Sequence, residues 1–220
     1  MKKFTKLVVI TAVISICFGC TKKEDLGINF NTKKNEVKLN YKTTNPVVAM
    51  KIEDYGSIVI ELYPEKCENT VNNFISLVKH GFYDGNSFHR LVPGFVLQGG
   101  DPEGTGSGGP GYKIKGEFKN NGYDKNDLKH KKRIVSMARS NDNDSAGSQF
   151  FIMLGDSRHL DNDYAAFGKV IDGYKTITKI EKDAVVEDEQ SGKLRKNIKI
   201  KKALVDTKGK KYQEVEKIEE

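Results

Sequence analysis

The side chains of this sequence best suited to chemistry lie between residues 88 and 101. A run of β-forming residues there carries Arg90, and Phe95 and Gln98 follow after a Pro-Gly corner. A guanidinium offers several hydrogen-bond donors in a fixed geometry, and an aromatic ring beside it offers an apolar wall. An arginine next to an apolar run more often lays only its aliphatic stem along that surface. Taken alone, these residues therefore favour a structural role for Arg90, with substrate binding as the alternative.

Other apparent motifs fail on their context. Residues 104–109 fit G-x-G-x-x-G, but a proline and a strand-like segment follow instead of the helix that a dinucleotide site needs. Asp142 and Asp144 resemble the start of a calcium loop, yet its twelfth position is Met153 rather than Glu. The four histidines and Cys67 lack zinc-ligand spacing. We therefore expect neither a metal nor another cofactor.

Three blocks of the sequence resemble the cyclophilins, a family of peptidyl-prolyl cis/trans isomerases. They are FHRLVPGFVLQGGD at residues 88–101, SMAR at 136–139 with AGSQFFI at 146–152, and AFGKV at 166–170. The resemblance extends over about residues 47–205. It implies a mainly β fold, a closed eight-stranded antiparallel β-barrel capped by two α-helices, with substrate bound in an outer groove. It also implies isomerisation of X-Pro bonds in proline-containing polypeptides.

The same resemblance implies roles for individual residues. The catalytic group would be Arg90, Phe95 and Gln98. The substrate-binding residues would be Val96, Gly106, Ala138, Arg139, Gln149, Phe151, His159, Leu160 and Tyr164. In this scheme the Arg90 guanidinium donates a hydrogen bond to the prolyl nitrogen, mainly in the twisted state of the bond.

The sequence departs from the family pattern at several positions. His159 stands where the best-known eukaryotic members carry Trp, and Tyr164 stands where they carry His. Val96 replaces a usual Met, and Arg133 occupies a position often held by Gly, which leaves the conformation of that turn open. Because Trp at this place is associated with tight cyclosporin binding, the resemblance implies reduced affinity for cyclosporin.

Two other function classes remain as alternatives. A binding module could grip proline-containing segments without turnover, but the intact set of Arg90, Phe95 and Gln98 favours an enzyme. A surface adhesin could use the basic residues 130–133. Aromatic stacking residues do not accompany this cluster, so a solvated loop is favoured and we expect no nucleic-acid partner. We also expect a monomer.

The pattern of apolar residues predicts the elements that position this site. A hairpin is expected at 47–52 and 57–62, and a helix with Val71, Phe74 and Val78 on one face is expected after a cap at Asn69 or Thr70. That helix should end at a glycine, residue 81. Further short apolar runs follow at 87–92, 95–98, 134–138, 149–154 and 165–171. A second helix is predicted at 174–182, and a closing strand with a bulge is predicted at 197–205.

The N-terminus has the features of an export signal. Three lysines precede a mostly apolar run at residues 7–19, which is too short for a membrane-spanning helix, where about 20 residues are needed. Gly19 and Cys20 then resemble a lipobox, although an ordinary cleaved secretory signal is an alternative. We predict a signal peptide at 1–19 and a lipid on Cys20. Cleavage of residues 1–19 would remove three lysines and no acidic residue, which lowers the formal net charge from +7 to +4.

These features predict the domain organisation and location. The polar residues 20–45 are predicted to be a flexible, lipid-anchored tether spanning about 25–30 Å. An isomerase domain is predicted at 46–206 and a charged, frayed tail at 207–220. The protein is expected outside the cytoplasm, anchored to a bacterial membrane, where it would assist the folding of exported proteins.

Overall fold

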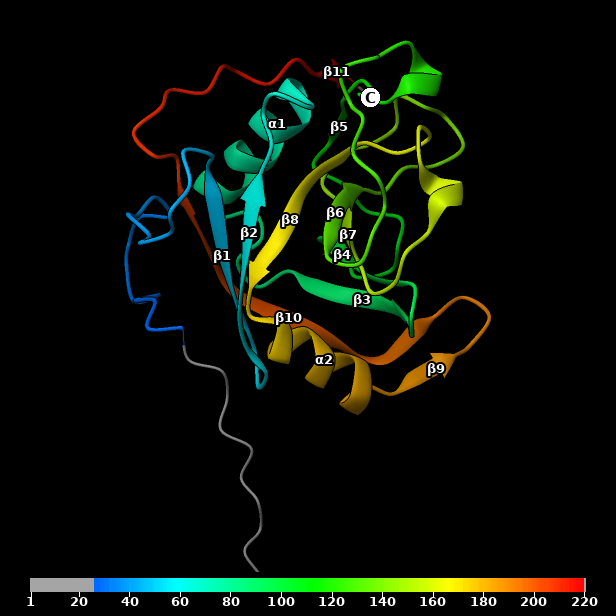
Figure 1. Cartoon of the computed structure of the whole chain (residues 1–220). Coiled ribbons are helices and arrows are strands. Elements are labelled where there is room, and N and C mark those ends of the chain that lie inside the picture. Colours follow the sequence, from blue (N-terminus) through cyan, green and yellow to red (C-terminus); the bar gives the residue numbers. More distant parts are fainter. Residues whose placement is uncertain (1–25, 220) are drawn as a thin grey trace, which may run out of the picture.

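The computed structural model describes residues 26–219, so the predicted signal peptide and Cys20 lie outside the described residues (Figure 1). Its centre is a closed antiparallel barrel with the strand order β1-β2-β8-β6-β7-β4-β3-β10, and β10 pairs with β1 to close it. The barrel strands are Val47–Ile52 (β1), Gly56–Leu62 (β2), Ser87–Val92 (β3), Val96–Asp101 (β4), Ile134–Met137 (β6), Phe150–Met153 (β7), Ala166–Asp172 (β8) and Lys193–Asp206 (β10). The predicted eight-stranded barrel is confirmed.

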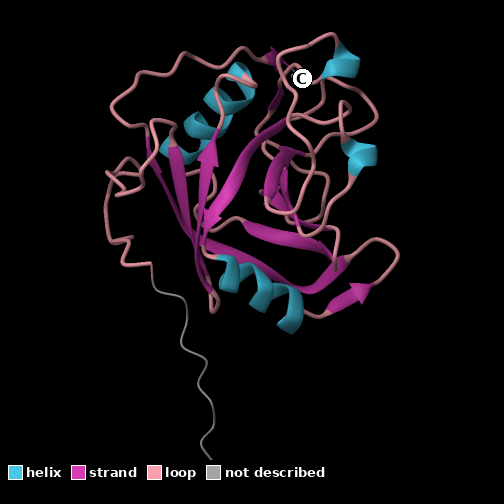
Figure 2. Cartoon of the chain, viewed as in Figure 1, coloured by secondary structure: helices cyan, strands magenta, loops and turns pink. Residues whose placement is uncertain are grey.

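Helices cover the two ends of the barrel, as Figure 2 shows. The two α-helices are Glu68–Lys79 (α1) and Tyr174–Asp183 (α2), and short 3-10 turns occur at Lys119–Asn121 (η1) and Arg158–Leu160 (η2). Three short strands lie outside the barrel: Tyr112–Lys113 (β5), Val186–Asp188 (β9) and Ile218–Glu219 (β11). Within residues 26–219, no helix has the length and apolar character needed to cross a bilayer.

The predicted hairpin and closing strand are present. The β1 and β2 strands pair from Val47 opposite Glu61 to Ile52 opposite Gly56. On the other side of β1, Lys51 pairs with Lys202 but Ile52 pairs with Ile200, so β10 contains one extra residue there. This β-bulge is the slip that the alternation of apolar residues in β10 indicated.

The predicted cap of the first helix is wrong. Helix α1 begins at Glu68, so Asn69 and Thr70 lie within its first turn. Their backbone N–H groups donate to the carboxylate of Glu117, at 3.0 and 2.6 Å. A residue 47 positions away thus supplies the acceptor that a local side chain was expected to provide. The predicted end is confirmed, because Gly81 follows the helix with φ of +72°.

Residues 26–45 differ from the predicted flexible tether, because they lie along the outside of the barrel. Glu36 forms a parallel bridge with Val205, and the Leu39 N–H donates to the Asp206 carboxylate at 2.8 Å. Their apolar side chains cover the outer faces of β1 and β2, in a cluster that joins Leu26, Ile28, Phe30, Val37, Leu39 and Tyr41 to Val47, Ala49 and Val59. Alternate residues such as 37, 39 and 41 point to one side of an extended chain, which permits this packing.

The C-terminal segment also differs from the predicted frayed tail. Strand β11 pairs with β5, and Tyr212 and Val215 pack against the main core. Asn69 and Glu216 exchange hydrogen bonds of 2.9 Å with each other, through the side chain of Asn69 and the backbone of Glu216. Strand pairing, two hydrogen bonds and the packing of Tyr212 and Val215 together hold this segment on the barrel.

Candidate active site

Nine of the twelve residues assigned to the isomerase site line one pocket on the outside of the barrel. Strands β3, β4 and β7, the end of β6 and the η2 turn supply its walls, and its volume is about 200 Å³. The lining residues are Arg90, Phe95, Val96, Gln98, Ala138, Arg139, Phe151, Leu160 and Tyr164. The pocket thus combines an apolar floor with two arginines and one amide.

The remaining three residues lie next to this pocket. Gly106 and Gln149 line an adjoining polar hollow of about 390 Å³, which also includes Gln98 and Arg139. His159 is exposed, and its ring stacks on Phe95 with the centroids 5.7 Å apart. All twelve predicted residues are therefore gathered on one outer face of the barrel.

The apolar floor arises from the alternation of side chains along β7. Phe150 and Ile152 point into the barrel core, whereas Phe151 and Met153 belong to a second cluster on the outside. The rings of Phe151 and Tyr164 meet edge to face at 5.9 Å. Phe151 is buried at 5% exposure, so its ring is held in place by its neighbours and forms part of the apolar floor.

Two hydrogen bonds hold the guanidinium of Arg90. Its Nε donates to the backbone carbonyl of Ser191 at 2.7 Å, and its Nη1 donates to Oε1 of Gln98 at 3.2 Å. Burial lowers the pKa of Arg90 from its ordinary value, but an arginine keeps its charge in proteins. The site therefore presents a fixed cation beside an apolar pocket.

The amides of Gln98 and Gln149 connect Arg90 to a glycine-rich loop. Gln98 donates to Gln149 at 3.1 Å, and Gln149 donates to the carbonyls of Gly106 and Gly108 at 3.0 and 2.9 Å. The loop itself is held by the carboxylate of Asp101, which accepts several of its backbone N–H groups. Burial would raise the pKa of Asp101, but these hydrogen bonds bring it below its usual value.

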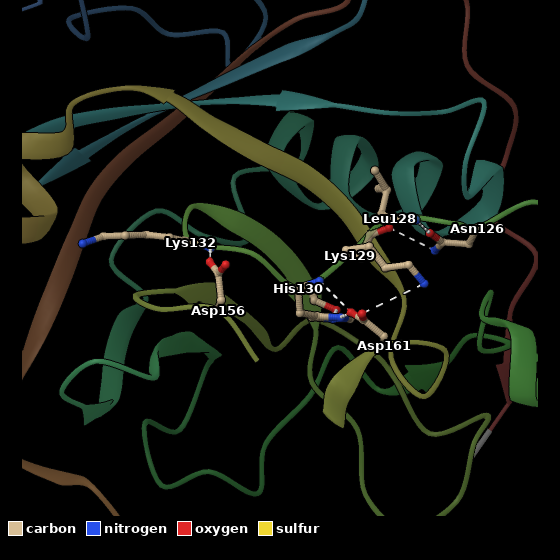
Figure 3. A network of polar contacts seen from close by, with 9 residues as sticks. Asn126, Leu128, Lys129, His130, Lys132, Asp156 and Asp161 are labelled. Atoms are coloured by element: carbon tan, nitrogen blue, oxygen red, sulfur yellow. Dashed lines mark hydrogen bonds and ion pairs between the residues drawn. The ribbon is translucent and has the colours of Figure 1, made fainter. Parts of the chain in front are cut away.

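A buried histidine, His130, lies beside the pocket residue Phe151, and Figure 3 shows its contacts with Asp161. The His130 ring stacks on Phe151 with a centroid distance of 6.1 Å. Its Nδ1 donates to the Asp161 carboxylate at 3.2 Å, and its Nε2 lies 3.1 Å from the Ser136 hydroxyl. Burial lowers the pKa of His130, against the opposing effect of Asp161, so the neutral ring is favoured.

The basic cluster at 130–133 is thus not the uniformly solvated loop that we predicted. His130 is buried, while the backbone N–H of Lys132 donates to Asp156 at 2.8 Å. Arg133 adopts φ of +84°, the left-handed conformation of a glycine, and its guanidinium lies 3.4 Å from the centroid of the Tyr174 ring. The turn therefore keeps the backbone that glycine would give, and the arginine packs on α2.

His89, next to Arg90 in the chain, lies where β3 shifts register against β4, between Phe88 and Arg90. It is 5% exposed, and neither ring nitrogen has a hydrogen-bond partner among the described residues. Burial lowers its pKa. Within residues 26–219, no group of three or more His, Cys, Asp or Glu side chains is arranged to hold a metal ion. The pocket itself offers apolar walls, hydrogen-bonding groups and the guanidinium groups of Arg90 and Arg139.

Fold and pocket together define a closed β-barrel that binds its ligand on the outer face of its strands. Residues 47–205 match the family described as "Cyclophilin type peptidyl-prolyl cis-trans isomerase/CLD". The chain belongs to the cyclophilin family and is a peptidyl-prolyl cis/trans isomerase.

Relatives from distant organisms agree with this assignment. Peptidyl-prolyl cis-trans isomerase B of Bacillus subtilis is 48% identical over 122 residues, which are 56% of this chain and 81% of that protein. A peptidyl-prolyl cis-trans isomerase of Helicobacter pylori is 42% identical over 134 residues, 60% of this chain and 78% of that protein. A cyclophilin-type isomerase of Cryptosporidium parvum, crystallised in the presence of the dipeptide Ala-Pro, has a TM-score of 0.62 and 34% identity, covering 72% of this chain and 98% of that one.

Proposed function

We propose that this isomerase acts on X-Pro bonds of exported proteins and assists their folding, with Arg90 as its central catalytic residue. The observation that carries the catalytic assignment is the guanidinium of Arg90, held by two hydrogen bonds beside the apolar floor of the pocket. Export is supported by the charged and apolar pattern of residues 1–19.

The reaction needs stabilisation of a twisted bond and no bond cleavage. The X-Pro amide resists rotation with a barrier of about 18–20 kcal/mol, because its C–N bond has partial double-bond character. When the bond twists, resonance is lost and the prolyl nitrogen regains a lone pair. A donor that bonds this nitrogen only in the twisted state lowers the barrier, whereas equal binding of all states does not.

Arg90 is the donor in this scheme. A charge-assisted hydrogen bond contributes about 1.5–3 kcal/mol, which corresponds to about 10–150-fold in rate. Arg90 alone is therefore insufficient for an efficient enzyme. The remaining acceleration is assigned to a pocket that fixes the proline ring while the other side of the bond rotates.

The other residues bind and orient the substrate. Phe95 and Phe151, together with Val96, Leu160 and Tyr164, form walls of suitable size for a proline ring. Gln98 within β4 and Gln149 immediately before β7 offer amide groups to the peptide backbone. The edge at Ala138 and Arg139 is where the extended substrate would lie. The relative from Cryptosporidium parvum was crystallised in the presence of the dipeptide Ala-Pro, which supports a proline-containing ligand.

The catalytic assignment is tested by comparing two arginine variants in a peptide isomerisation assay. Arg90→Ala should lower kcat/KM at least about tenfold, by loss of the charge-assisted bond. Arg195→Ala removes an arginine of β10 outside the pocket and should keep the wild-type rate. Wild-type turnover in a folded Arg90→Ala variant would contradict the assignment. A protein that binds the peptide without accelerating its isomerisation would instead support the binding-module alternative.

Lipid attachment at Cys20 is a separate proposal. It is supported by the basic start, the apolar run at 7–19 and the small Gly19 before the cysteine. Mass spectrometry of the membrane fraction should find an acylated Cys20 at the mature N-terminus, and Cys20→Ser should release the protein from that fraction. A mature form cleaved at another residue would overturn the proposal.

A further inference from the structure

We propose that the turn between β9 and β10, residues 188–192, is a positioning element that orients the catalytic arginine. This inference rests on the proposed role of Arg90. The turn lies about 100 residues away in sequence, and its Ser191 carbonyl accepts the Arg90 Nε hydrogen at 2.7 Å. Gln98 holds Nη1 at 3.2 Å, so the guanidinium is fixed at two of its nitrogens. These bonds use two of the five N–H donors of the side chain.

A backbone carbonyl is a suitable partner for this purpose. The carbonyl fixes the plane of the guanidinium without adding a negative charge that would compensate the positive charge of Arg90. Among residues 26–219, none of the ion pairs of the structure includes Arg90. The cation therefore keeps its full charge for the developing lone pair of the substrate, and its orientation is set in advance.

The turn is itself rigidly built. The Asp188 carboxylate accepts the Gln190 N–H at 3.0 Å and the Ser191 hydroxyl at 2.7 Å. The Gly192 N–H donates to the Asp188 carbonyl, and the Gly192 carbonyl accepts the Leu91 N–H, both at 2.8 Å. The last bond attaches the turn to β3 at the residue after Arg90. The carbonyl that orients the guanidinium is thus held by its own turn and by the strand that carries Arg90.

Gly192 is the position at which this arrangement requires glycine. Its φ is +76°, and a Cβ there would lie 2.7 Å from Val92 Cγ2, 2.9 Å from the Leu91 carbonyl oxygen and 3.3 Å from Arg90 Cγ. A methyl group would therefore push the turn away from β3 and from Arg90. Gly209 has a similar φ of +73°, but nothing lies within 4 Å of its Cβ position. It is a matched control for backbone strain without the clash.

The first test compares these two substitutions. Gly192→Ala should lower kcat at least about fivefold, because small misplacements of a catalytic group cost large factors in rate. Its KM should stay within about twofold, since the walls of the proline pocket are unchanged. Gly209→Ala should keep both constants. An unchanged kcat for a folded Gly192→Ala variant, in an enzyme that needs Arg90, would overturn the inference.

A milder pair of variants covers the case in which Gly192→Ala does not fold. Asp188→Ala removes the acceptor for Gln190 and Ser191 and should lower kcat, whereas Asp188→Asn retains a side-chain acceptor and should restore most of the loss. Equal kcat values for wild type and Asp188→Ala would contradict a positioning role.

A double-mutant cycle with Arg90→Ala separates this inference from the catalytic assignment. If the turn acts through Arg90, the turn variant should have no further effect once Arg90 is absent. An equal loss in both backgrounds would show that the turn acts on the fold in general and would overturn the inference. Wild-type activity of Arg90→Ala alone would instead show that the catalytic assignment fails.

Discussion

Phe150 and Phe151 are neighbours in β7, yet they belong to two different regions of the molecule. Phe150 is fully buried inside the barrel, where it meets Phe74 edge to face at 5.4 Å and Tyr83 at 5.5 Å. Phe151 points outward, against His130 and Tyr164, and lines the pocket beside Arg90. One strand thus supplies the core with one face and the site with the other.

The difference between the regions explains where chemistry can take place. The interior is closed by hydrogen-bonded strands on all sides and filled by large side chains, such as Phe74, Phe88 and Phe167. The outer cluster is smaller, and the polar side chains beside it form hydrogen bonds with loops. Arg90 donates to the carbonyl of Ser191, and His130 donates to the carboxylate of Asp161. We therefore expect changes in the interior to alter stability, and changes outside to alter turnover.

The largest effect is expected for a truncation in the interior. Phe74 contacts Tyr83, Phe150 and Phe167 within 5.4 Å between ring centroids. Phe74→Ala should lower the free energy of unfolding by about 3–5 kcal/mol, through lost burial and the cavity left behind. Urea denaturation measures this loss, and the isomerase rate per folded molecule should be unchanged. A folded variant with reduced kcat would show that the two regions are coupled.

A substitution that adds ligand contact on the outer face of the barrel should leave the free energy of unfolding unchanged. His159→Trp restores the larger ring and the indole N–H, next to Phe95. About 50–80 Å² of additional apolar contact is worth about 1–2 kcal/mol, so the inhibition constant for cyclosporin should fall about five- to thirtyfold. Inhibitor titration in the peptide assay measures this. Equal inhibition constants for both forms would mean that residue 159 does not control the drug contact.

The smallest expected effect is a pH dependence of stability caused by His130. Because burial lowers its pKa in the folded protein, the unfolded chain binds this proton more readily. Stability should therefore decline as the pH falls below about 6.5, the ordinary pKa of a histidine in the unfolded chain. Asp161 opposes the shift, whereas Lys129 and His159 add to it, and the buried His89 contributes in the same direction.

The variant His130→Asn isolates this contribution. Between pH 7 and 5 its free energy of unfolding should fall less steeply than that of the wild type. Urea midpoints at several pH values provide the measurement. Parallel curves for the two proteins would show that His130 does not cause the decline.

The sequence predicted the parts of the fold that depend on local pattern. The hairpin, both helices and the bulge in β10 follow from periodicity and glycine positions, and these were confirmed. Eight of the twelve site residues lie in the sequence blocks that resemble the family, and the other four, Gly106, His159, Leu160 and Tyr164, were assigned from the wider resemblance over residues 47–205. The structure then places all twelve of them on one face of the barrel.

The features that the sequence did not predict depend on contacts between distant residues. Glu117 caps α1 from another part of the chain, and Ser191 reaches Arg90 across 101 positions. His130 was grouped with its basic neighbours, because nothing local indicates that Asp161 and Phe151 surround it. The polar composition of residues 26–45 predicts a tether, but their few alternating apolar side chains pack on the distant strands β1 and β2, a contact that local sequence does not indicate.

The division of roles between the two regions is tested most directly by Phe150→Leu and Phe151→Leu, measured side by side for unfolding free energy and isomerase kcat/KM. The two substitutions make the same chemical change at adjacent positions on opposite faces of β7. Phe150→Leu should cause the larger loss of unfolding free energy and keep the wild-type activity per folded molecule. Phe151→Leu should lose kcat/KM with a smaller loss of stability. The reverse result, or equal effects of both substitutions on both quantities, would contradict the account.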